Sequence, residues 1–491
     1  MGKRNFVRGA VLLSAASLIG KALSAVFKIP LDRYFIGPEG IAIYQNAYNI
    51  YNWMLAITAT GVPLAVSNLV ADSDEDEAAE IRASAMWFVT FMGVIAAAGL
   101  FIFARPLAAM IAGGGSGYAA PAIRVMSVGV VFMGVSSAYR GYFQGRGNML
   151  PSALSQIADS LSKACIGLGV CALLLPKGRA IAAAGAMSGV TVGTVIGSVI
   201  LLVMGRKFIK VYRGPKLSTA KRIVMLAIPV TLGSAGFSCM MMADNFTVQN
   251  ILVGLGNSIE ESAGLFGYLT RAFMIYNLPA TLIAAVTVSV APACAEAAHS
   301  GDRGLLREHA VSSLRLLAFV SAPCMMGCLC FPGPILSLLY GTSLHRELLM
   351  FTGALMILIP FTQVVSGILQ ATGCVWKPII VLGATLAVKV ALNFLLLPAM
   401  GIAGAPLATV ISYAAGCVVL IVLFRGHMGF GFPVGTFVRP FVAAAIGALA
   451  ALGLFYYTAA PFIVVGCVMA LVYIVMALLL KAIDIKALLR K

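Results

Sequence analysis

The chain has 491 residues, of which 61% are hydrophobic and only 10% are charged. This composition excludes a soluble globular protein, because apolar windows of about 20 residues, long enough to cross a bilayer, recur from one end to the other. The formal net charge of +17 is accounted for by basic loops on one side of a membrane, so no nucleic-acid partner is expected. We therefore predict an all-α polytopic membrane protein.

We predict about fourteen membrane-spanning helices, each of about 20 residues or more. Their approximate ranges are 8–30, 41–68, 84–104, 121–141, 153–175, 180–204, 222–252, 263–291, 310–331, 348–370, 378–397, 402–424, 437–457 and 461–481. The first range follows a basic segment, as the apolar part of a secretory signal does, but Lys21 interrupts its apolar run and the pattern then resumes. We therefore expect a retained first span.

Basic residues are concentrated in alternate loops. One set of loops, with the C-terminal tail, contains Arg206, Lys207, Lys210, Arg213, Lys216, Lys221, Arg222, Arg303, Arg307, Arg425, Arg439, Lys481, Lys486, Arg490 and Lys491. The other set holds chiefly Arg33, Arg105, Lys177, Arg179 and Arg346. Because cytoplasmic loops carry the excess of Lys and Arg, both termini are predicted to be cytoplasmic. The acidic run at 72–80 falls in a cytoplasmic loop and is expected to be a solvated connector.

Short motifs recur in the same order at a spacing of about 225 residues, the mark of an internal repeat. The matches are Ile50-Tyr51-Asn52 with Ile275-Tyr276-Asn277, Phe143-Gln144-Gly145 and Gly147 with Leu369-Gln370-Ala371 and Gly373, and Leu173-Leu174-Leu175-Pro176 with Leu395-Leu396-Leu397-Pro398. They predict two parallel six-helix repeats, spans 1–6 and 7–12, followed by two C-terminal helices. The predicted lobes are 1–215 and 216–428, with helices 13 and 14 in 429–491. Duplicated bundles of this kind place a substrate site between the halves.

Basic residues inside the predicted spans are the main clue to function. An intramembrane cation costs about 2.5–3.5 kcal/mol at a helix centre, so several cations with few acids favour an anionic ligand. Lys21 and Lys28 share one helical face two turns apart, with Arg33 at the outer mouth and Arg271 in the outer half of span eight. Polar residues expected to face the same space are Gln45, Asn46, Asn49, Asn52, Asp244 and Asn245. Ammonium groups and amides together suit phosphate and sugar hydroxyl groups. For Lys28, near a span end, snorkelling is the alternative.

Two further lysines have local explanations. Lys163 has Asp159 one turn earlier on the same face, which favours an internal ion pair. Lys389 has no such neighbour on its own helix, so Asp244 in span seven is its candidate partner. No metal site is expected, because the ten cysteines and four histidines show no ligand spacing. No cofactor is expected either, since no GxxxxGK[ST] phosphate loop is present.

Three stretches resemble a known family. They are Tyr44-Gln45-Asn46-Ala47-Tyr48, the run 61–70 and, most specific, Arg140-Gly141-Tyr142-Phe143-Gln144-Gly145 with Asn148-Met149, Pro151 and Ser155-Gln156. Over its whole length the chain resembles the polysaccharide-biosynthesis flippases of the SpoVB and MurJ-like branch, in the multidrug/oligosaccharidyl-lipid/polysaccharide exporter superfamily. The resemblance implies a fourteen-helix flippase of the bacterial cytoplasmic membrane. Its implied cargo is an undecaprenyl-diphosphate-linked glycan, most often the peptidoglycan precursor lipid II, moved to the outer leaflet by alternating access. A role in sporulation rests on the resemblance alone.

The resemblance also implies roles for particular residues. Family members carry essential cations on spans one and eight, and Lys21, Lys28 and Arg271 stand at matching positions. Lysine here replaces the arginine common on span one, which removes the bidentate fork. Some members bind sodium through a span-seven carboxylate and polar groups on spans eleven and twelve. Span eleven here offers Lys389 and Asn393, so we hypothesise that Lys389 pairs with Asp244 in place of sodium. Coupling to the membrane potential or to another monovalent cation stays open.

Other functions remain open from the residues alone. A flippase for another lipid-linked oligosaccharide, such as a capsule or teichoic precursor, fits them equally well. A multidrug exporter for cations is expected to have an acidic cavity. A polytopic glycan ligase or polymerase is expected to have a large external loop. We therefore expect a transporter without enzymatic activity, whose partners are a lipid-linked glycan diphosphate and membrane lipids.

Overall fold

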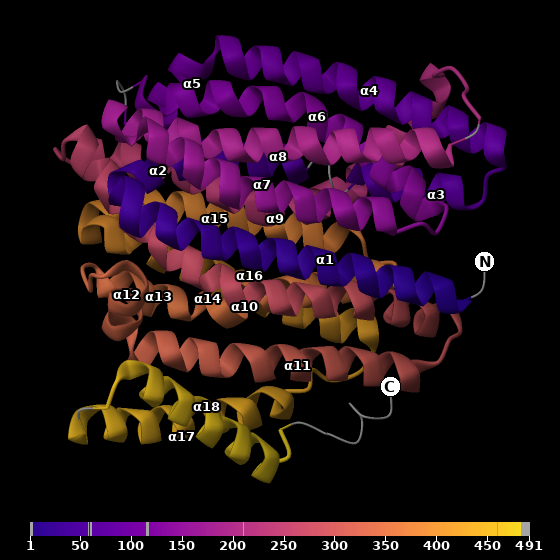
Figure 1. Ribbon diagram of the computed structural model, residues 1–491. Helices are drawn as coiled ribbons and strands as arrows, with labels where there is room; N and C mark the ends of the chain where they lie inside the picture. The colour runs from indigo at the N-terminus through magenta and orange to yellow at the C-terminus, as the bar shows by residue number, and fades with distance from the viewer. Residues whose placement is uncertain are drawn as a thin grey trace. The chain divides into compact units, whose positions relative to one another are not determined.

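The computed structural model describes residues 3–56, 58, 61–113, 117–209, 211–458 and 460–482. Side chains are described for these residues except 3–11, 14, 21, 25, 229, 233–235, 237, 277, 278 and 280–292. Regular structure in this part of the chain is helical, without a strand (Figure 1). Contacts divide the chain into two compact units, Met1–Thr270 and Arg271–Lys491.

The first unit is built from ten α-helices, the last of which continues into the second unit. In chain order its elements are α1 (Lys3–Pro30), the π-helical turn η1 (Leu31–Ile36), α2 (Gly37–Ala56), α3 (Val62–Ala71), α4 (Glu75–Ile102), α5 (Ala104–Ile111), η3 (Gly117–Ala119), α6 (Ala120–Gly145), α7 (Leu150–Leu174), η4 (Leu175–Lys177), α8 (Arg179–Phe208), α9 (Leu217–Gly254) and α10 (Ile259–His299). Helices α4, α6, α7 and α8 lie side by side and nearly parallel in Figure 1.

The second unit continues from α10 with shorter helices. They are α11 (Arg303–Cys330), α12 (Pro332–Tyr340), α13 (Arg346–Gly353), α14 (Leu355–Ala371), α15 (Trp376–Met400), the 3-10 turn η5 (Gly401–Ala403), α16 (Gly404–Met428), α17 (Gly435–Tyr457) and α18 (Phe462–Leu479). Helices α15 and α16 pack against each other, as do α17 and α18.

Within the described residues, nine helical stretches are long and apolar enough to cross a membrane. They are Glu75–Ile102, Gly117–Gly145, Leu150–Lys177, Arg179–Phe208, Arg303–Cys330, Arg346–Ala371, Trp376–Met428, Gly435–Tyr457 and Phe462–Leu479. The stretch Trp376–Met428 contains both α15 and α16. Its helices would reach about 80 Å end to end, enough for two crossings of a hydrocarbon core of about 30 Å. The all-α polytopic class is confirmed, and the count of fourteen stays a prediction.

The predicted single span at 41–68 contains two of the described α-helices. Helix α2 ends at Ala56, and α3 begins at Val62 with Pro63 in its first turn. Proline has no backbone N–H to donate to the preceding turn, so it is tolerated at a helix start and disfavoured in a helix interior. The described residues between the two helices, 58 and 61, are π-helical, and hydropathy alone does not show where α3 begins because the residues on both sides are apolar.

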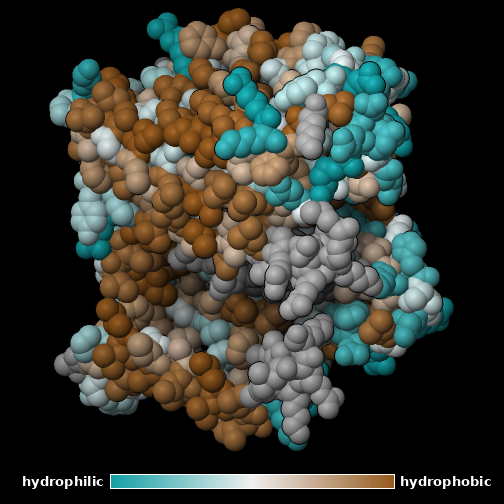
Figure 2. Space-filling model, turned by 45° about the vertical axis from the view of Figure 1, so that its right-hand side comes forward, coloured by the Kyte–Doolittle hydropathy of each residue, from teal (hydrophilic) through white to brown (hydrophobic). Residues whose placement is uncertain are grey.

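Helix α15 has two chemically distinct faces. Thr385, Lys389 and Asn393, spaced four residues apart, are buried, whereas Ile380 and Leu395 are 67% exposed. This inverts the pattern of a soluble protein and is typical of a helix that turns its apolar side to lipid. Figure 2 shows large continuous areas of hydrophobic side chains on one face of the molecule, with most hydrophilic side chains toward its edges.

Helices α7 and α8 approach closely because glycine recurs every fourth residue on α8, at Gly185, Gly189, Gly193 and Gly197. A Cβ atom at Gly189 would lie 2.4 Å from the backbone nitrogen of Gly167 on α7, closer than any side chain is tolerated. Small residues at this spacing let membrane helices pack backbone to backbone. This close contact holds α7, which carries Asp159 and Lys163, against α8.

Two turns that the repeat predicts to correspond have the same backbone hydrogen bonds. Asn148 N donates to Phe143 O at 2.9 Å after α6, and Cys374 N donates to Leu369 O at 2.8 Å after α14. Each turn contains a glycine with positive φ, 72° at Gly147 and 94° at Gly373, where other residues are strained. The predicted lobe bounds describe a sequence repeat, whereas the two units are defined by contacts, so these bounds stay predictions.

Candidate functional site

Lys28 near the end of α1 is held against α2. Its Nζ donates to Gln45 Oε1 at 3.2 Å and lies 4.1 Å from the centroid of the Tyr48 ring. It lies 5.9 Å from the Tyr44 ring. A desolvated cation over an aromatic face gains about 2 kcal/mol, and this stabilises the ammonium group without cancelling its charge. Lys28 has no carboxylate partner in the part of the chain that the structure describes.

An amide chain continues from Gln45 and joins α2 to α9. The Gln45 side chain donates to Asn49, whose Nδ2 donates to Asn245 Oδ1 at 2.8 Å. Asn245 Nδ2 in turn donates to the backbone oxygen of Asn46 at 3.1 Å. Three of the amides expected to face one space, those of Gln45, Asn49 and Asn245, are thus in contact. Each amide both donates and accepts, which suits hydroxyl-rich ligands.

A column of tyrosines on α2 was missed by the sequence analysis. The ring centroids of Tyr44 and Tyr48 are 5.5 Å apart, and those of Tyr48 and Tyr51 are 5.8 Å apart, both pairs stacked. Lys28 contacts the middle ring, Tyr48, and lies near Tyr44, whereas Lys163 Nζ lies 5.6 Å from the Tyr51 ring at one end of the column. The signal was present, because positions 44, 48 and 51 lie on one face of a helix.

The predicted ion pair between Asp159 and Lys163 is confirmed. Lys163 Nζ lies 2.8 Å from Asp159 Oδ2, and the two side chains are only 9% and 19% exposed. Arg140, from the motif most specific to the family resemblance, donates from Nε to Ser155 Oγ at 3.0 Å. Lys163 therefore has a counter-charge in Asp159, whereas Lys28 has none among the described residues. Of the two lysines, Lys28 is the better candidate to bind an anionic ligand.

The other predicted binding residues are placed one by one. Lys21 lies in α1, but its side chain is outside the described residues. Arg33 is exposed in η1, 5.3 Å from the Tyr34 ring, and Asn52 is half-buried on α2. Arg271 is buried on α10 in the second unit, 5.1 Å from the Tyr340 ring. The structure thus brings Lys28 and Gln45 together, and the grouping of these two with Arg271 stays a prediction.

The predicted coupling residues are all buried. Asp244 is 3% exposed on α9 in the first unit, and Lys389 and Asn393 are 0% exposed, one turn apart on α15 in the second unit. A fully buried lysine is rare unless it is paired. The pairing of Lys389 with Asp244 joins two units and stays a prediction.

The acidic run at 72–80 is largely exposed to solvent, as expected, but only 72–74 connect two helices, and the rest forms the start of α4. Helix α4 begins at Glu75 with Asp74 as its N-cap, and the carboxylates bind the basic segment before α9. Arg213 pairs with Asp76 at 2.7 Å and Lys216 with Glu80 at 2.6 Å. Sequence reasoning recognised both sets of charges but did not pair them, because more than a hundred residues separate them.

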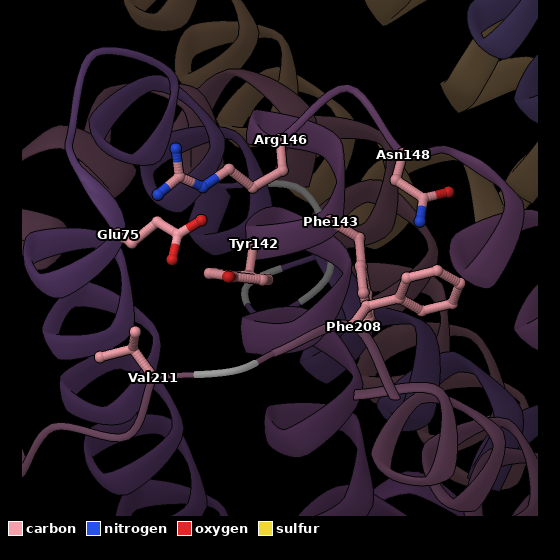
Figure 3. Close-up of a pocket in the computed structure, with 7 residues that line it drawn as sticks. All are labelled: Glu75, Tyr142, Phe143, Arg146, Asn148, Phe208 and Val211. Carbon is pink, nitrogen blue, oxygen red and sulfur yellow. The ribbon is translucent and has the colours of Figure 1, made fainter. Parts of the chain in front are cut away.

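A pocket of about 240 Å³ lies next to this ionic cluster. Figure 3 shows Glu75 and Arg146 on one side of it and Phe143 and Phe208 on the other, with Tyr142 between. Arg146 donates to the backbone oxygens of Ser73 at 3.1 Å and Asp74 at 2.6 Å. Tyr142 and Phe143 of the family motif therefore line this pocket. Arg140, earlier in the same motif, instead contacts Ser155.

Metal-binding chemistry finds no support in the described side chains, among which no three His, Cys, Asp or Glu residues form a ligand group. All ten cysteines are free thiols. The first unit contains a cation, Lys28, beside a column of aromatic rings and a chain of amides. Groups of this kind suit a charged ligand that carries hydroxyl groups.

The chain is similar in sequence to several known proteins. The sequence model of the family described as Polysaccharide biosynthesis protein matches residues 6–298, and that of the MatE family matches residues 229–395. In Bacillus subtilis (strain 168), the chain is 27% identical to the uncharacterized membrane protein YabM, over 84% of this chain and 79% of the relative. It is 26% identical to the lipid II flippase MurJ, over 87% and 84%. It is 25% identical to stage V sporulation protein B, over 84% and 82%.

Solved structures share the fold. The lipid II flippase MurJ in an inward closed conformation matches with a TM-score of 0.74 at 15% identity, covering 95% of this chain and 98% of that chain. An inward-facing multidrug resistance MATE family transporter of the MOP superfamily matches with a TM-score of 0.69 at 16% identity, covering 86% and 98%. These matches confirm the resemblance expected from the motifs.

Proposed function

Because the chain belongs to the polysaccharide biosynthesis protein family, whose sequence model spans residues 6–298, we propose that it is a flippase for lipid-linked glycans. It moves an undecaprenyl-diphosphate-linked glycan from the inner to the outer leaflet of the bacterial cytoplasmic membrane. The observation that carries this proposal is Lys28, a charge held by Gln45 and Tyr48 beside a chain of amides. A phosphate group supplies the counter-charge, and the amides suit sugar hydroxyl groups.

Lipid II is the cargo that we propose first. The similarity to the lipid II flippase MurJ extends over 87% of the chain, and it supports this choice over other lipid-linked glycans. The similarity to stage V sporulation protein B extends the proposal to a role in sporulation. We infer that both termini are cytoplasmic, from the excess of Lys and Arg in alternate loops.

The proposed mechanism is alternating access between the two predicted repeats. In the inward-open state Lys21, Lys28 and Arg271 contact the diphosphate, and Gln45 and Asn52 face the sugars. The polyprenyl tail stays in lipid throughout, because a hydrocarbon chain gains nothing from entering a polar cavity. No covalent bond is made or broken, so the protein acts as a transporter and not as an enzyme.

Energy coupling forms a separate part of the proposal. We infer that the Lys389 ammonium group pairs with Asp244, next to Asn393, where a sodium ion would otherwise bind. The membrane potential then acts on the net charge moved, at about 2.3 kcal/mol per charge per 100 mV. Transport with full sodium dependence in wild type and in Lys389→Ala alike would contradict this pairing.

The function is tested by complementation in a bacterium depleted of its own lipid II flippase. Wild type should restore growth, whereas Lys21→Ala, Lys28→Ala and Arg271→Ala should fail at matched protein levels. Loss of a charged hydrogen bond to phosphate, worth about 1.5–3 kcal/mol, predicts transport at least about tenfold slower. Lys221→Ala, which removes an exposed lysine from the start of α9, is the matched control and should restore growth.

Each outcome has a separate meaning. Rescue by all three cavity variants would show that these cations are structural. A well-expressed wild type that fails here, but restores a strain depleted of a capsule or teichoic precursor flippase, would establish the alternative cargo. That alternative is retained because Lys28 and its amides recognise phosphate and hydroxyl groups, which all lipid-linked glycans carry.

A further inference from the structure

A second cavity in the first unit has a volume of about 440 Å³, within the range of about 300–1,000 Å³ usual for ligand pockets. It is lined by residues of α2, η3 and α9, by the turn that leads into α8, and by the start of α10. Its side chains include Asn46, Tyr118 and Gln249, with Lys177, Arg179, Glu39 and Glu260 around them. Of the residues predicted to face the binding space, Asn46 is among those that line this cavity, whereas Lys28 and Gln45 are not.

Two polar atoms at this cavity lack partners. Asn46 and Gln249 are each 1% exposed. Asn46 Oδ1, an acceptor, and Gln249 Nε2, a donor, form no hydrogen bond within the described part of the chain. Buried polar groups are nearly always paired, because an unmade hydrogen bond costs free energy that water no longer compensates. A donor and an acceptor left open at one cavity therefore point to a ligand that offers both.

The charges at the cavity indicate an uncharged ligand. Lys177 and Arg179 are balanced by Glu39 and Glu260, and Arg179 pairs directly with Glu39. A phosphate group therefore meets no net positive field here, unlike at Lys28. A sugar hydroxyl group donates and accepts at once, as Asn46 and Gln249 require. Tyr118, which is 48% exposed, adds an aromatic face against which the apolar side of a sugar ring can pack.

The cavity adjoins the amide chain between α2 and α9. The backbone oxygen of Asn46 accepts from Asn245, and Gln249 lies one turn after Asn245 on α9. Both open atoms are sealed from solvent in this conformation, so a ligand reaches them when α2 and α9 separate. The outer part of the cavity, beside Tyr118 and Arg179, is open to solvent in this state, and only the two open atoms at its inner end need this separation to become available.

We propose that this cavity is a binding site for uncharged sugar residues, in which Asn46 accepts a hydrogen bond from the sugar and Gln249 donates one to it. The inference rests on the proposed function in one respect, since it assigns this cavity to the glycan part of the cargo. The diphosphate is left to the cations, and this cavity is a second place of contact for the sugars besides Gln45 and Asn52.

The test is saturation-transfer NMR with free N-acetylglucosamine and purified full-length protein, with inorganic pyrophosphate as a competitor. Wild type should transfer saturation to the sugar protons, and pyrophosphate should leave the signal unchanged. Gln249→Leu and Asn46→Leu should each weaken binding about five- to tenfold, the effect of losing one hydrogen bond at a buried group. Gln363→Leu makes the same change on α14 and should bind as wild type does.

Thermal unfolding of each variant verifies that a weaker signal does not come from misfolded protein. Equal signals in all variants, or no signal from folded wild type, would overturn the sugar site. Displacement of the sugar by pyrophosphate would overturn it too, because the site would then recognise charge. Complementation remains independent of this assay. If wild type restores growth but does not bind the sugar, the sugar site is wrong and the flippase function stands. If it binds the sugar but does not restore growth, the lipid II flippase function is contradicted and the sugar site stands.

Discussion

At the scale of single residues, Lys28 and Lys163 both lie against tyrosines of α2 but differ in their other partners. Lys163 has Asp159 within 2.8 Å, so its charge is compensated inside the helix α7. Lys28 has Gln45 and Tyr48 instead. An amide oxygen and an aromatic face lower the cost of burying an ammonium group without neutralising it. Lys28 therefore has no counter-charge of its own among the described residues, and an anionic ligand can supply one.

Asp159→Asn should destabilise the protein by about 3–5 kcal/mol, because it leaves the Lys163 ammonium group buried without its counter-charge. Thermal unfolding in detergent measures the effect. The double variant Asp159→Leu with Lys163→Met should recover most of the lost stability, since removing both charges removes the burial cost. Equal destabilisation in the single and double variants would show that the pair does not act as an ion pair.

Glycine spacing decides how closely α7 and α8 pack at the scale of elements. Gly189 lies against Gly167, and a Cβ atom at Gly193 would lie 2.8 Å from Asp159 Oδ1. The same contact therefore packs the two helices and positions the carboxylate that pairs with Lys163. Helix packing and electrostatics in this unit depend on one set of small residues.

Gly189→Val should lower stability by about 3 kcal/mol or more, because overpacking of a close helix contact forces the backbones apart. Gly169→Val is the matched control, since a Cβ atom at Gly169 has no neighbour within 4 Å. Unfolding temperatures of the two variants in the same detergent compare the sites directly. Similar losses in both variants would mean that valine disturbs these helices for reasons other than the contact.

Orientation in the membrane is a property of the whole molecule. Lys216, paired with Glu80, belongs to the basic segment that is predicted to be cytoplasmic, and Lys177 belongs to the opposite set of loops. In a cysteine-free background, Lys177→Cys should react with an impermeant thiol reagent in intact cells, and Lys216→Cys should react only after permeabilisation. The reverse result would invert the predicted topology and the direction of transport.

Composition and periodicity predicted the fold class, because an apolar content of 61% has few solutions other than membrane helices. The repeat also pointed to Gly147 and Gly373, whose turns share their hydrogen bonds. The start of α3 at Val62, inside a long apolar stretch, was not predicted from hydropathy. Local signals thus define class and turns, but not where one helical element gives way to the next within such a stretch.

The candidate site was predictable only in part. Lys28 and Gln45 were expected to face one space, and they are in contact. Gln249 was not proposed, although its position one turn after Asn245 on the same helix was a signal present in the sequence. The pairing of Arg213 with Asp76 was also missed, since tertiary folding alone brings such distant charges together. Sequence reveals which charges need partners, and the fold determines the partners.

The ion pairs before α9 have a mechanical consequence. They fasten the segment that precedes Leu217 to the start of α4, and Thr219 and Arg222 in the first turns of α9 bind Glu80 and Glu77 of the same helix, so this end of α9 is anchored. A helix of 38 residues is about 57 Å long at 1.5 Å per residue. A pivot of about 5° at Leu217 displaces its far end by about 5 Å. A small rotation of α9 at its anchored end thus becomes a displacement of several ångströms near Gln249.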